Sequence, residues 1–250
     1  MSFDWVDRGV TARGVSERRF DASRAGRVIP GVLWMPEDPP DAPPPLVLMG
    51  HGGSAHKRQD YIVGLGRRLV RHHGFAAVAI DGPVHGDRRA DAGADIAAVN
   101  KDFWRTWRDD PTMTDEMVAD WRAVLDALQE PGRLGAGPVG WWGLSMGTIL
   151  GLPVVAAEAR VSVAVLGLMG LTGPTRDRLR DDAAAVRCPV LFLVQWDDEL
   201  FERQRGLDLF SALGTDDKRL HANPGGHVQV PFDEFRATEE FLVSHLRVQE

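Results

Sequence analysis

The stretch "PVGWWGLSMGTILGLPVVAAEA", residues 138–159, decides the fold of this chain. Its first six residues are apolar and suit a short buried strand, and the part from residue 146 onward is long enough for a helix. Ser145 stands at the junction, two positions from Gly143 and two from Gly147. A G-x-S-x-G pattern at such a junction is typical of a sharp turn that pushes a nucleophilic hydroxyl out of a sheet. The alternative is that Ser145 is only a small residue where a strand turns into a helix.

Apolar runs of the same kind recur along the chain, each bounded by Gly, Pro or Asp. They are rich in Val, Leu or aromatic residues and lack the alternation of a half-buried strand, which indicates burial on both faces of a sheet. These predicted strands are "PLVLMG" (45–50), "FAAVAID" (75–81), "VSVAVLGLM" (161–169) and "CPVLFLVQW" (188–196), with "KRLHA" (218–222) as the last.

Helical patterns lie between the predicted strands. Tyr61, Leu65 and Leu69 repeat every four residues and predict a helix over about 59–73. The alternation of strands and helices predicts an α/β fold with a mostly parallel central sheet and helices on both faces. Two more helices are predicted from apolar stripes: Met117, Trp121, Val124 and Leu128, preceded by a capping-box spacing of Thr112 and Asp115, and Phe235, Leu242 and Leu246, preceded by Pro231.

Two segments depart from this alternation. Residues 16–34 predict an antiparallel hairpin, and the proline-rich segment 35–45 joins it to the main sheet, because proline is poorly tolerated in central strands. The segment from about 85 to 112 is longer than a usual strand–helix connection and is therefore a candidate substrate-facing loop. Its aromatic residues either line a pocket or form a small local core: Phe103, Trp104 and Trp107.

The composition is that of one globular protein. At 250 residues the chain is long enough for a substantial core, and we expect residues 1–250 to form one domain. The net charge of −7, without a run of Lys or Arg, argues against nucleic acid as a partner. Cys188 is the only cysteine, which excludes an intrachain disulfide and a zinc site built from cysteines. Since no apolar stretch has the length of a signal peptide core or a membrane span, we expect a cytoplasmic protein without a membrane partner.

A serine hydroxyl needs a base to accept its proton, and His227 is the best candidate among the eight histidines. It lies in the glycine-rich segment "NPGGHVQVP" after the last predicted strand, where a loop can aim a side chain. His221 is the alternative, but a strand would hold its ring against one face of the sheet. An acid that orients the base is expected just past "LFLVQW", at Asp197 or Asp198, because catalytic groups gather at the carboxyl ends of strands in open α/β sheets.

The chain order of these residues resembles that of the α/β-hydrolase superfamily. The serine of "GLSMG" comes first, the acid follows, and His227 is last, and the likeness extends over nearly the whole chain. In similar proteins the acid commonly lies three residues after a position often occupied by glycine. Gln195 takes that position here, which favours Asp198 and leaves Asp197 as the alternative.

The segment "GHGGSAHK", residues 50–57, resembles the loop that supplies an oxyanion-hole amide in this superfamily. The resemblance assigns that amide to Gly53, with Ser54 as the neighbouring alternative, and gives His51 a hydrogen bond that supports the loop. A tight glycine turn without a ligand is the other interpretation. The amide of Met146 is the first donor, because it lies at the predicted N-terminus of a helix.

The resemblance implies a serine esterase. The hairpin with "VIPGVLWMP" and the absence of a large helical cap are most similar to dienelactone-hydrolase-like esterases. True dienelactone hydrolases typically carry a cysteine nucleophile, and Ser145 in its place favours a carboxylesterase that cleaves small to medium esters through an acyl-enzyme. No cofactor is implied. Candidate substrate-binding residues are Trp104, Trp107, Trp142 and Trp196, with a core position as the alternative for Trp142.

Other functions stay open at this point. A thioesterase, amidase or peptidase would use the same three residues, and a non-catalytic binding protein on this fold would usually lack one of them. Nothing in the sequence indicates an oligomeric state. We predict no metal site, because the four candidate ligands lack a recognised ligand spacing: His51, His56, His85 and Asp87.

Overall fold

The computed structural model describes residues 1–91 and 93–247, and the strands within them form one ten-stranded sheet. The strands are β1 (Ser2–Trp5), β2 (Val10–Ala12), β3 (Val15–Arg24), β4 (Arg27–Pro36), β5 (Leu46–Gly50), β6 (Ala76–Ile80), β7 (Val139–Gly143), β8 (Val161–Gly167), β9 (Val190–Gln195) and β10 (Lys218–Asn223). Their order across the sheet is β1, β3, β4, β6, β5, β7, β8, β9, β10, and β2 pairs with β3 beside this path.

The sheet is parallel from β6 to β10 and antiparallel on its N-terminal side. The predicted N-terminal hairpin is confirmed as β3 and β4, which pair from Val15 opposite Pro36 to Arg24 opposite Arg27. Ala25 and Gly26 connect them with φ of 49° and 78°. Positive φ at both loop residues is the geometry that matches the twist of two antiparallel strands.

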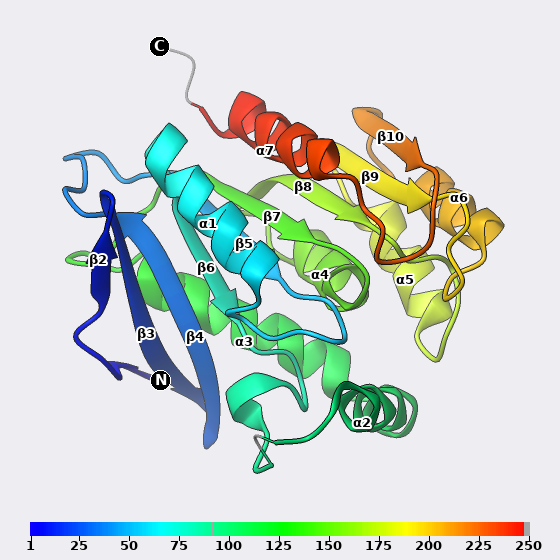
Figure 1. The fold of residues 1–250 in the computed structure, drawn as a ribbon, viewed down its shortest axis with the longest axis horizontal. Helices are drawn as coiled ribbons and strands as arrows, with labels where there is room; N and C mark the ends of the chain where they lie inside the picture. The colour runs from blue at the N-terminus through cyan, green and yellow to red at the C-terminus, as the bar shows by residue number, and fades with distance from the viewer. Residues whose placement is uncertain (92, 248–250) are drawn as a thin grey trace.

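Helices cover both faces of the sheet, as predicted. They are α1 (Asp60–His73), α2 (Ile96–Asp109), α3 (Met113–Leu128), α4 (Met146–Ala157), α5 (Arg176–Ala185), α6 (Arg203–Ala212) and α7 (Phe232–Leu246), with a short 3₁₀ turn η1 (Gly86–Arg88). Figure 1 shows α1 and α7 in front of the sheet and α3, α4 and α5 behind it. Between β8 and β9 the chain adds only α5, so the expectation that no large cap is present is confirmed.

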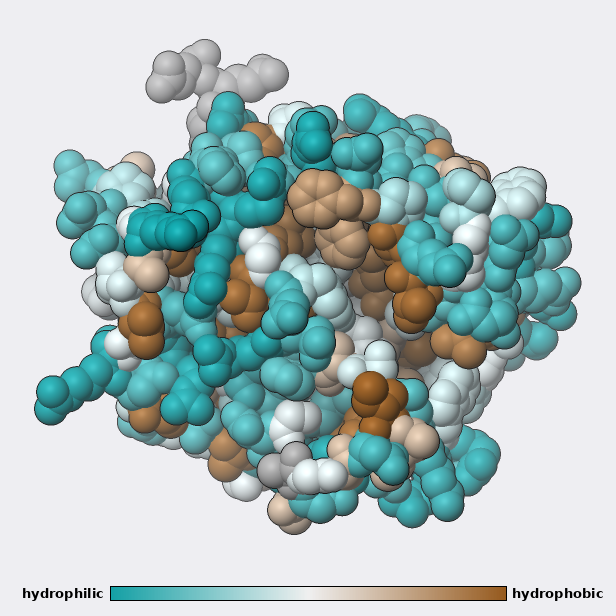
Figure 2. Space-filling view, viewed as in Figure 1, coloured by the Kyte–Doolittle hydropathy of each residue, from teal (hydrophilic) through white to brown (hydrophobic). Residues whose placement is uncertain are grey.

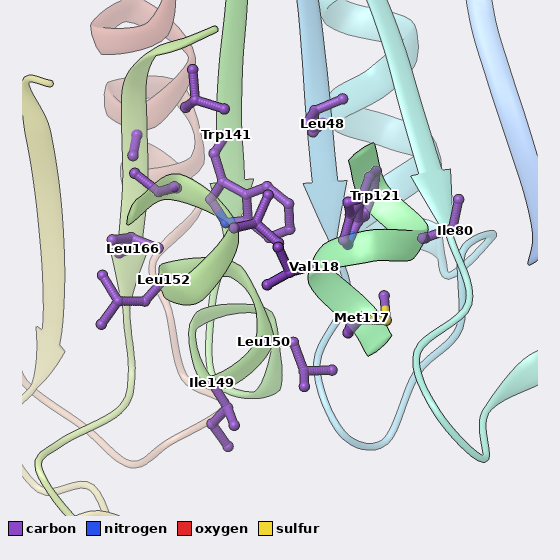
Figure 3. Close-up of a cluster of buried hydrophobic side chains, with 14 of the residues drawn as sticks. Leu48, Ile80, Met117, Val118, Trp121, Trp141, Ile149, Leu150, Leu152 and Leu166 are labelled. Carbon is purple, nitrogen blue, oxygen red and sulfur yellow. The ribbon is translucent and has the colours of Figure 1, made fainter. Parts of the chain in front are cut away.

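Each of the strands from β4 to β9 sends alternate side chains into two separate cores, because successive residues of a strand point to opposite faces. On β5, Leu48 lies in the core under α3 and α4, and Met49 lies in the core under α1 and α7. On β7, Trp141 and Trp142 divide in the same way. Trp141 meets Trp121 of α3 edge to face, with ring centroids 5.1 Å apart (Figure 3). Such pairs add about 0.5–1.5 kcal/mol to the gain from burial.

The segment from 85 to 112 is mainly helical, so the expectation of a loop is wrong over Ile96–Asp109. Asp95 begins α2, because its carboxylate accepts a hydrogen bond of 2.7 Å from the amide of Ala98. Phe103 and Trp107 are four residues apart on one face, and both are buried. The interpretation of these two rings as local core is therefore the right one.

The predicted capping box at Thr112 is also wrong. Thr112 precedes α3 with helical dihedral angles, and its hydroxyl donates to the carboxylate of Asp110 over 2.6 Å instead of capping the helix. The strands β1 and β2 escaped the sequence analysis because they are only four and three residues long. In β1 only Phe3 and Trp5 pack against the core, and β2 is exposed throughout.

The carboxyl ends of the parallel strands meet at one edge of the sheet. Loops after β5, β7, β9 and β10 carry the residues to which the sequence analysis assigned chemistry. Within residues 1–91 and 93–247, no helix has both the length and the apolar character needed to cross a membrane.

Candidate active site

Ser145 occupies a strained turn between β7 and α4. Its φ of 59° and ψ of −119° are unusual for a residue with a side chain, and such conformations persist only where the surroundings enforce them. Here the amide of Ser145 donates to the carbonyl of Gly167 over 3.0 Å. The hydroxyl of Thr148 accepts the amide of Gly167 over 2.8 Å, which ties the first turn of α4 to the end of β8.

The two glycines around Ser145 are required by close backbone approaches. A Cβ on Gly143 would lie 2.7 Å from the carbonyl oxygen of Gly147. A Cβ on Gly147 would clash with the carbonyl of Gly50 at the end of β5. The G-x-S-x-G spacing therefore lets α4 begin directly against the ends of two strands.

Ser145, His227 and Asp198 form a continuous chain of hydrogen bonds. Nε2 of His227 lies 2.8 Å from Oγ of Ser145, and Nδ1 lies 2.7 Å from Oδ2 of Asp198. His227 and the side chain of Asp198 are almost completely buried. The three residues come from the loops after β7, β9 and β10, whose carboxyl ends lie along the same edge of the sheet, with β8 between β7 and β9.

The two alternatives from the sequence lie elsewhere. The carboxylate of Asp197 accepts a hydrogen bond of 3.2 Å from the amide of Gly225, so it stabilises the loop before His227 and does not contact its ring. His221, on β10, lies 3.0 Å from the carboxylate of Glu234 in α7. Neither residue is part of the hydrogen-bond chain that reaches Ser145.

The carboxylate of Asp198 is ionised by its surroundings. Burial raises the pKa of Asp198. The hydrogen bonds from His227 and from the amides of Phe201 and Leu200 together lower it by more than burial raises it, so the pKa lies below its ordinary value. Those amides reach Oδ1 at 2.9 Å and 2.8 Å. One carboxylate oxygen is therefore fixed by the backbone, and the other faces the imidazole.

Glu199 supports the histidine from the outside. Its carboxylate accepts a hydrogen bond of 2.9 Å from the backbone amide of His227, and this bond lowers the pKa of Glu199 below its ordinary value. The side chain thus ties the loop after β10 to the loop after β9. The sequence analysis did not select it, although it directly follows the two aspartates that were selected.

His51 fixes the peptide group that carries the amide of Gly53. The amide of Gly82 donates to Nε2 of His51 over 2.9 Å, so Nδ1 carries the proton and donates to the carbonyl of Gly52 over 2.8 Å. Burial, and next the neighbouring His85, lower the pKa of His51 to about 3, which keeps the ring neutral. Because the C=O and N–H of a trans peptide point in opposite directions, holding the carbonyl of Gly52 also aims the amide of Gly53.

Two more side chains hold the same loop. The hydroxyl oxygen of Tyr61, on α1, accepts the amide of Gly52 over 2.7 Å. Nε2 of His85 lies 2.7 Å from the carbonyl of Gly53. A Cβ on Gly53 would lie 3.9 Å from Cβ of Met146, so this loop meets the N-terminus of α4. The amide of Met146 opens α4 and is not used within the helix.

A cavity of about 200 Å³ opens beside Ser145. Figure 2 shows apolar side chains around a hollow near the start of α7. The cavity is lined by Gly52, Gly53, Ser54, Ala55, Tyr61, Trp142, Leu144, Ser145, Leu168, His227, Val228, Val230 and Phe235. Apolar walls with a few polar groups at one end are typical of a site for a small organic molecule.

Of the four tryptophans predicted to bind substrate, Trp142 lines this cavity and the other three do not. Trp107 is buried in the core behind α2 and donates to the hydroxyl of Thr175. Trp104 and Trp196 are each 46% exposed on the surface. Tyr61 of α1 and Phe235 of α7 line the cavity where tryptophans were predicted. The apolar periodicity that predicted these two helices did not indicate that their side chains face Ser145.

Metal ligands are not gathered in this region. Within the part of the chain that the structure describes, no three His, Cys, Asp or Glu side chains are arranged to hold a metal ion. His85, which the sequence analysis considered as a ligand, instead contacts the carbonyls of Pro83 and Gly53.

Among known proteins, the chain matches solved structures only. No protein-family model and no curated protein matches the chain. Among solved structures, a cold-adapted esterase from an Arctic intertidal metagenomic library is 43% identical, with a TM-score of 0.85, and the match covers 98% of this chain and 100% of that one.

More distant structures share the fold. A dienelactone hydrolase from Anabaena variabilis is 20% identical, with a TM-score of 0.68 over 94% of this chain and 100% of that one. An acetyl xylan esterase from a Thermoanaerobacterium species is 16% identical, with a TM-score of 0.76 over 98% of this chain and 88% of that one. Because the Arctic enzyme is 43% identical over its whole length, this chain belongs to the same family of esterases, and its sheet and flanking helices have the α/β-hydrolase fold.

Proposed function

We propose that this protein hydrolyses small to medium carboxylic esters, with Ser145 as nucleophile, His227 as base and Asp198 as the acid that orients the base. The observation that carries the proposal is the hydrogen-bond chain from Oγ of Ser145 through His227 to Asp198, with contacts of 2.8 Å and 2.7 Å. Ester hydrolysis is also the activity named for the Arctic enzyme that is 43% identical.

The proposed reaction begins when His227 takes the proton of Ser145 as its oxygen attacks the ester carbonyl. The amides of Met146 and Gly53 then donate to the carbonyl oxygen as it gains charge, each contributing about 3 kcal/mol to the transition state. His227 returns the proton to the leaving alcohol, and an acyl-enzyme on Ser145 remains. Water, activated by His227 in the same way, attacks this intermediate, releases the acid and restores the serine.

The strained turn at Ser145 supports the proposed role as nucleophile. The backbone there has a φ of 59°, which directs the hydroxyl away from the strand and into the cavity that His227 also lines. Strain of this kind costs of order 1–3 kcal/mol and needs a compensating use. The ionised Asp198, with its pKa below the ordinary value, supports the imidazolium that forms when His227 holds the proton.

The size of the cavity supports the proposed substrate range. At about 200 Å³ it is smaller than the cavities that hold drug-sized ligands, which start at about 300 Å³. We further propose that residues 1–250 act as one domain and that the protein acts in the cytoplasm. The lone, half-buried thiol of Cys188, whose pKa burial raises to about 11, fits a compartment without disulfides.

The test is a fluorophosphonate probe together with p-nitrophenyl acetate and butyrate. We expect the wild-type protein to be labelled on Ser145 and to release p-nitrophenol, and Ser145→Ala to lose both. Thr148→Ser, which keeps the hydroxyl beside Ser145, is a control for disturbance of the strained turn. Folded wild-type protein that is neither labelled nor active would contradict the proposed function.

A further inference from the structure

A second cavity lies directly beyond the one at Ser145, between α1 and α7. Its volume is about 330 Å³, larger than the 200 Å³ of the first. It is lined by Asp60, Tyr61, Gly64, Leu65, Arg68, Phe232, Phe235, Arg236 and Glu239. Tyr61 and Phe235 line both cavities, so their two rings are the partition between them.

One half of this partition is fixed. The ring of Tyr61 is held by the hydrogen bond that its hydroxyl accepts from Gly52, and burial, partly offset by this bond, raises the pKa of Tyr61 to about 12. Trp142 packs against it with ring centroids 6.0 Å apart, and Nε1 of Trp142 donates to the hydroxyl of Thr238. Movement of Tyr61 would disturb the loop that carries the amide of Gly53.

The other half is held by packing alone. Phe235 is half-buried in the first turns of α7, stacked on Trp142 at 6.0 Å and tilted against Tyr61 at 6.4 Å. A phenyl ring has no polar group that could anchor it. Truncation of this one side chain would therefore remove half of the partition between the two cavities.

The second cavity suits a hydrocarbon chain. Leu65, Phe232 and the backbone of Gly64 offer apolar surface, and a Cβ on Gly64 would meet no atom within 4 Å. Among the charged residues that line the cavity, the guanidinium of Arg68 is paired with the carboxylate of Glu239 over 2.7 Å, so the alkyl stem of Arg68 is left to contact a chain.

We propose that Phe235 is a specificity-determining residue, which ends the catalytic cavity and confines the enzyme to esters with short hydrocarbon chains. This proposal rests on the proposed ester hydrolysis at Ser145. The ring blocks chains that would otherwise continue into the cavity between α1 and α7. When the ring is removed, each methylene of a chain that enters that cavity leaves water, and its burial stabilises the bound ester. This stabilisation appears as a preference for longer chains.

The test compares ester series of rising chain length in Phe235→Ala and Phe235→Leu. One series varies the acyl chain of p-nitrophenyl esters from acetate to decanoate, and the other varies the alcohol of acetate esters. We expect kcat/KM for the long relative to the short member to rise at least about tenfold in Phe235→Ala, and less in Phe235→Leu, in one of the two series. The series that responds identifies the side of the ester that the cavity holds.

Two further variants separate this effect from loosening of α7. Phe241→Leu makes the same substitution on the same helix, in a buried ring that lines neither cavity, and we expect an unchanged ratio of long to short esters. Gly64→Leu added to Phe235→Ala fills the second cavity and should reverse the gain. An unchanged ratio in Phe235→Ala in both series, or an equal change in Phe241→Leu, would overturn the proposal.

Calorimetric binding of fatty acids from hexanoate to dodecanoate to Ser145→Ala, with and without Phe235→Ala, gives a readout that needs no turnover. We expect affinity to rise with chain length only when Phe235 is shortened. Absence of ester hydrolysis in the wild type would contradict the proposed function, and the binding data would still decide the role of Phe235. Equal dependence on chain length in both proteins would count against that role.

Discussion

The hydroxyl oxygen of Tyr61 accepts the amide of Gly52 over 2.7 Å, and this single contact joins the wall of the cavity to the loop that carries the proposed oxyanion donor. Tyr61 lies on α1, which is in front of the sheet (Figure 1), and Gly52 follows the carboxyl end of β5. The carbonyl of Gly52 is held from the other side by Nδ1 of His51. The shape of the cavity and the alignment of the proposed oxyanion donor therefore depend on the same few atoms.

Tyr61→Phe tests this connection, because it removes the hydroxyl and keeps the ring. The amide of Gly52 is then left without its partner, and the neighbouring amide of Gly53 loses its alignment. We expect kcat for p-nitrophenyl acetate to fall about tenfold or more, since loss of one oxyanion donor costs about 10²–10³. The ratio of long to short esters should stay the same because the ring still forms the partition. A changed ratio with unchanged kcat would show that Tyr61 acts only as a wall.

Asp198→Asn removes the charge that faces Nδ1 of His227, and the proposed mechanism predicts a fall in kcat of about 10³-fold or more. Asp197→Asn is the matched control one residue away, because its carboxylate contacts the amide of Gly225 and not the imidazole. We expect that variant to retain activity within about threefold. Steady-state kinetics on both proteins decide between them, and the opposite ranking would transfer the role of acid to Asp197.

Glu199 is predicted to position His227 through its backbone. Glu199→Gln keeps an acceptor for the amide of His227, whereas Glu199→Ala leaves none. We expect a fall in kcat of about tenfold in the alanine variant and little change in the glutamine variant. Since the hydrogen bond lowers the pKa of Glu199, the carboxylate and its contact should persist in the wild type down to a pH below its ordinary value of 4.5. Equal activity in the alanine variant and the wild type would remove Glu199 from the proposed support.

The sequence predicted the parts of the site that depend on local backbone. The G-x-S-x-G spacing is required because a Cβ on Gly147 would block the close contact of α4 with the end of β5. A constraint of this kind can be recognised from the glycine positions in the sequence. Ser145, Asp198 and His227 follow strand ends, and a parallel sheet brings those ends together whatever the side chains between them. For that reason Ser145, His227 and the pair Asp197 and Asp198 could be selected without knowledge of any contact, and the resemblance to the α/β-hydrolase superfamily then favoured Asp198.

The wall of the cavity could not be predicted in the same way. Tyr61 and Phe235 belong to amphipathic helices whose apolar stripe indicates burial but not the surface against which it packs. The sequence analysis chose Trp104 and Trp107 inside the predicted loop, yet Trp107 faces the core and Trp104 faces solvent, because Asp95 starts a helix that orients both. Which ring meets the serine is decided by the rotation of helices packed on the sheet, a property of the tertiary structure.

Stability should depend on pH through Glu17, which is buried on β3 opposite Trp34 of β4. Its carboxylate accepts the indole N–H of Trp34 over 2.9 Å and pairs with Arg58 and Arg67. Burial raises the pKa of Glu17, but these hydrogen bonds and charges together lower it by more than burial raises it. The pKa in the folded state therefore lies below the ordinary 4.5. The stabilisation is therefore complete above the pKa of the unfolded chain and is lost as the pH falls through that of the folded protein.

Glu17→Gln tests this sign. The amide can still accept the indole N–H but cannot pair with the arginines, and we expect a loss of about 1–3 kcal/mol in the free energy of unfolding at pH 7. The difference from the wild type should shrink as the pH falls below 4.5, because the unfolded wild-type chain takes up the proton first. Urea unfolding at pH 7, 5, 4 and 3 measures it, with Asp21→Asn on the same strand as a control for loss of one negative charge. A difference that stays constant down to pH 3 would mean that the charge of Glu17 contributes nothing and that only its packing does.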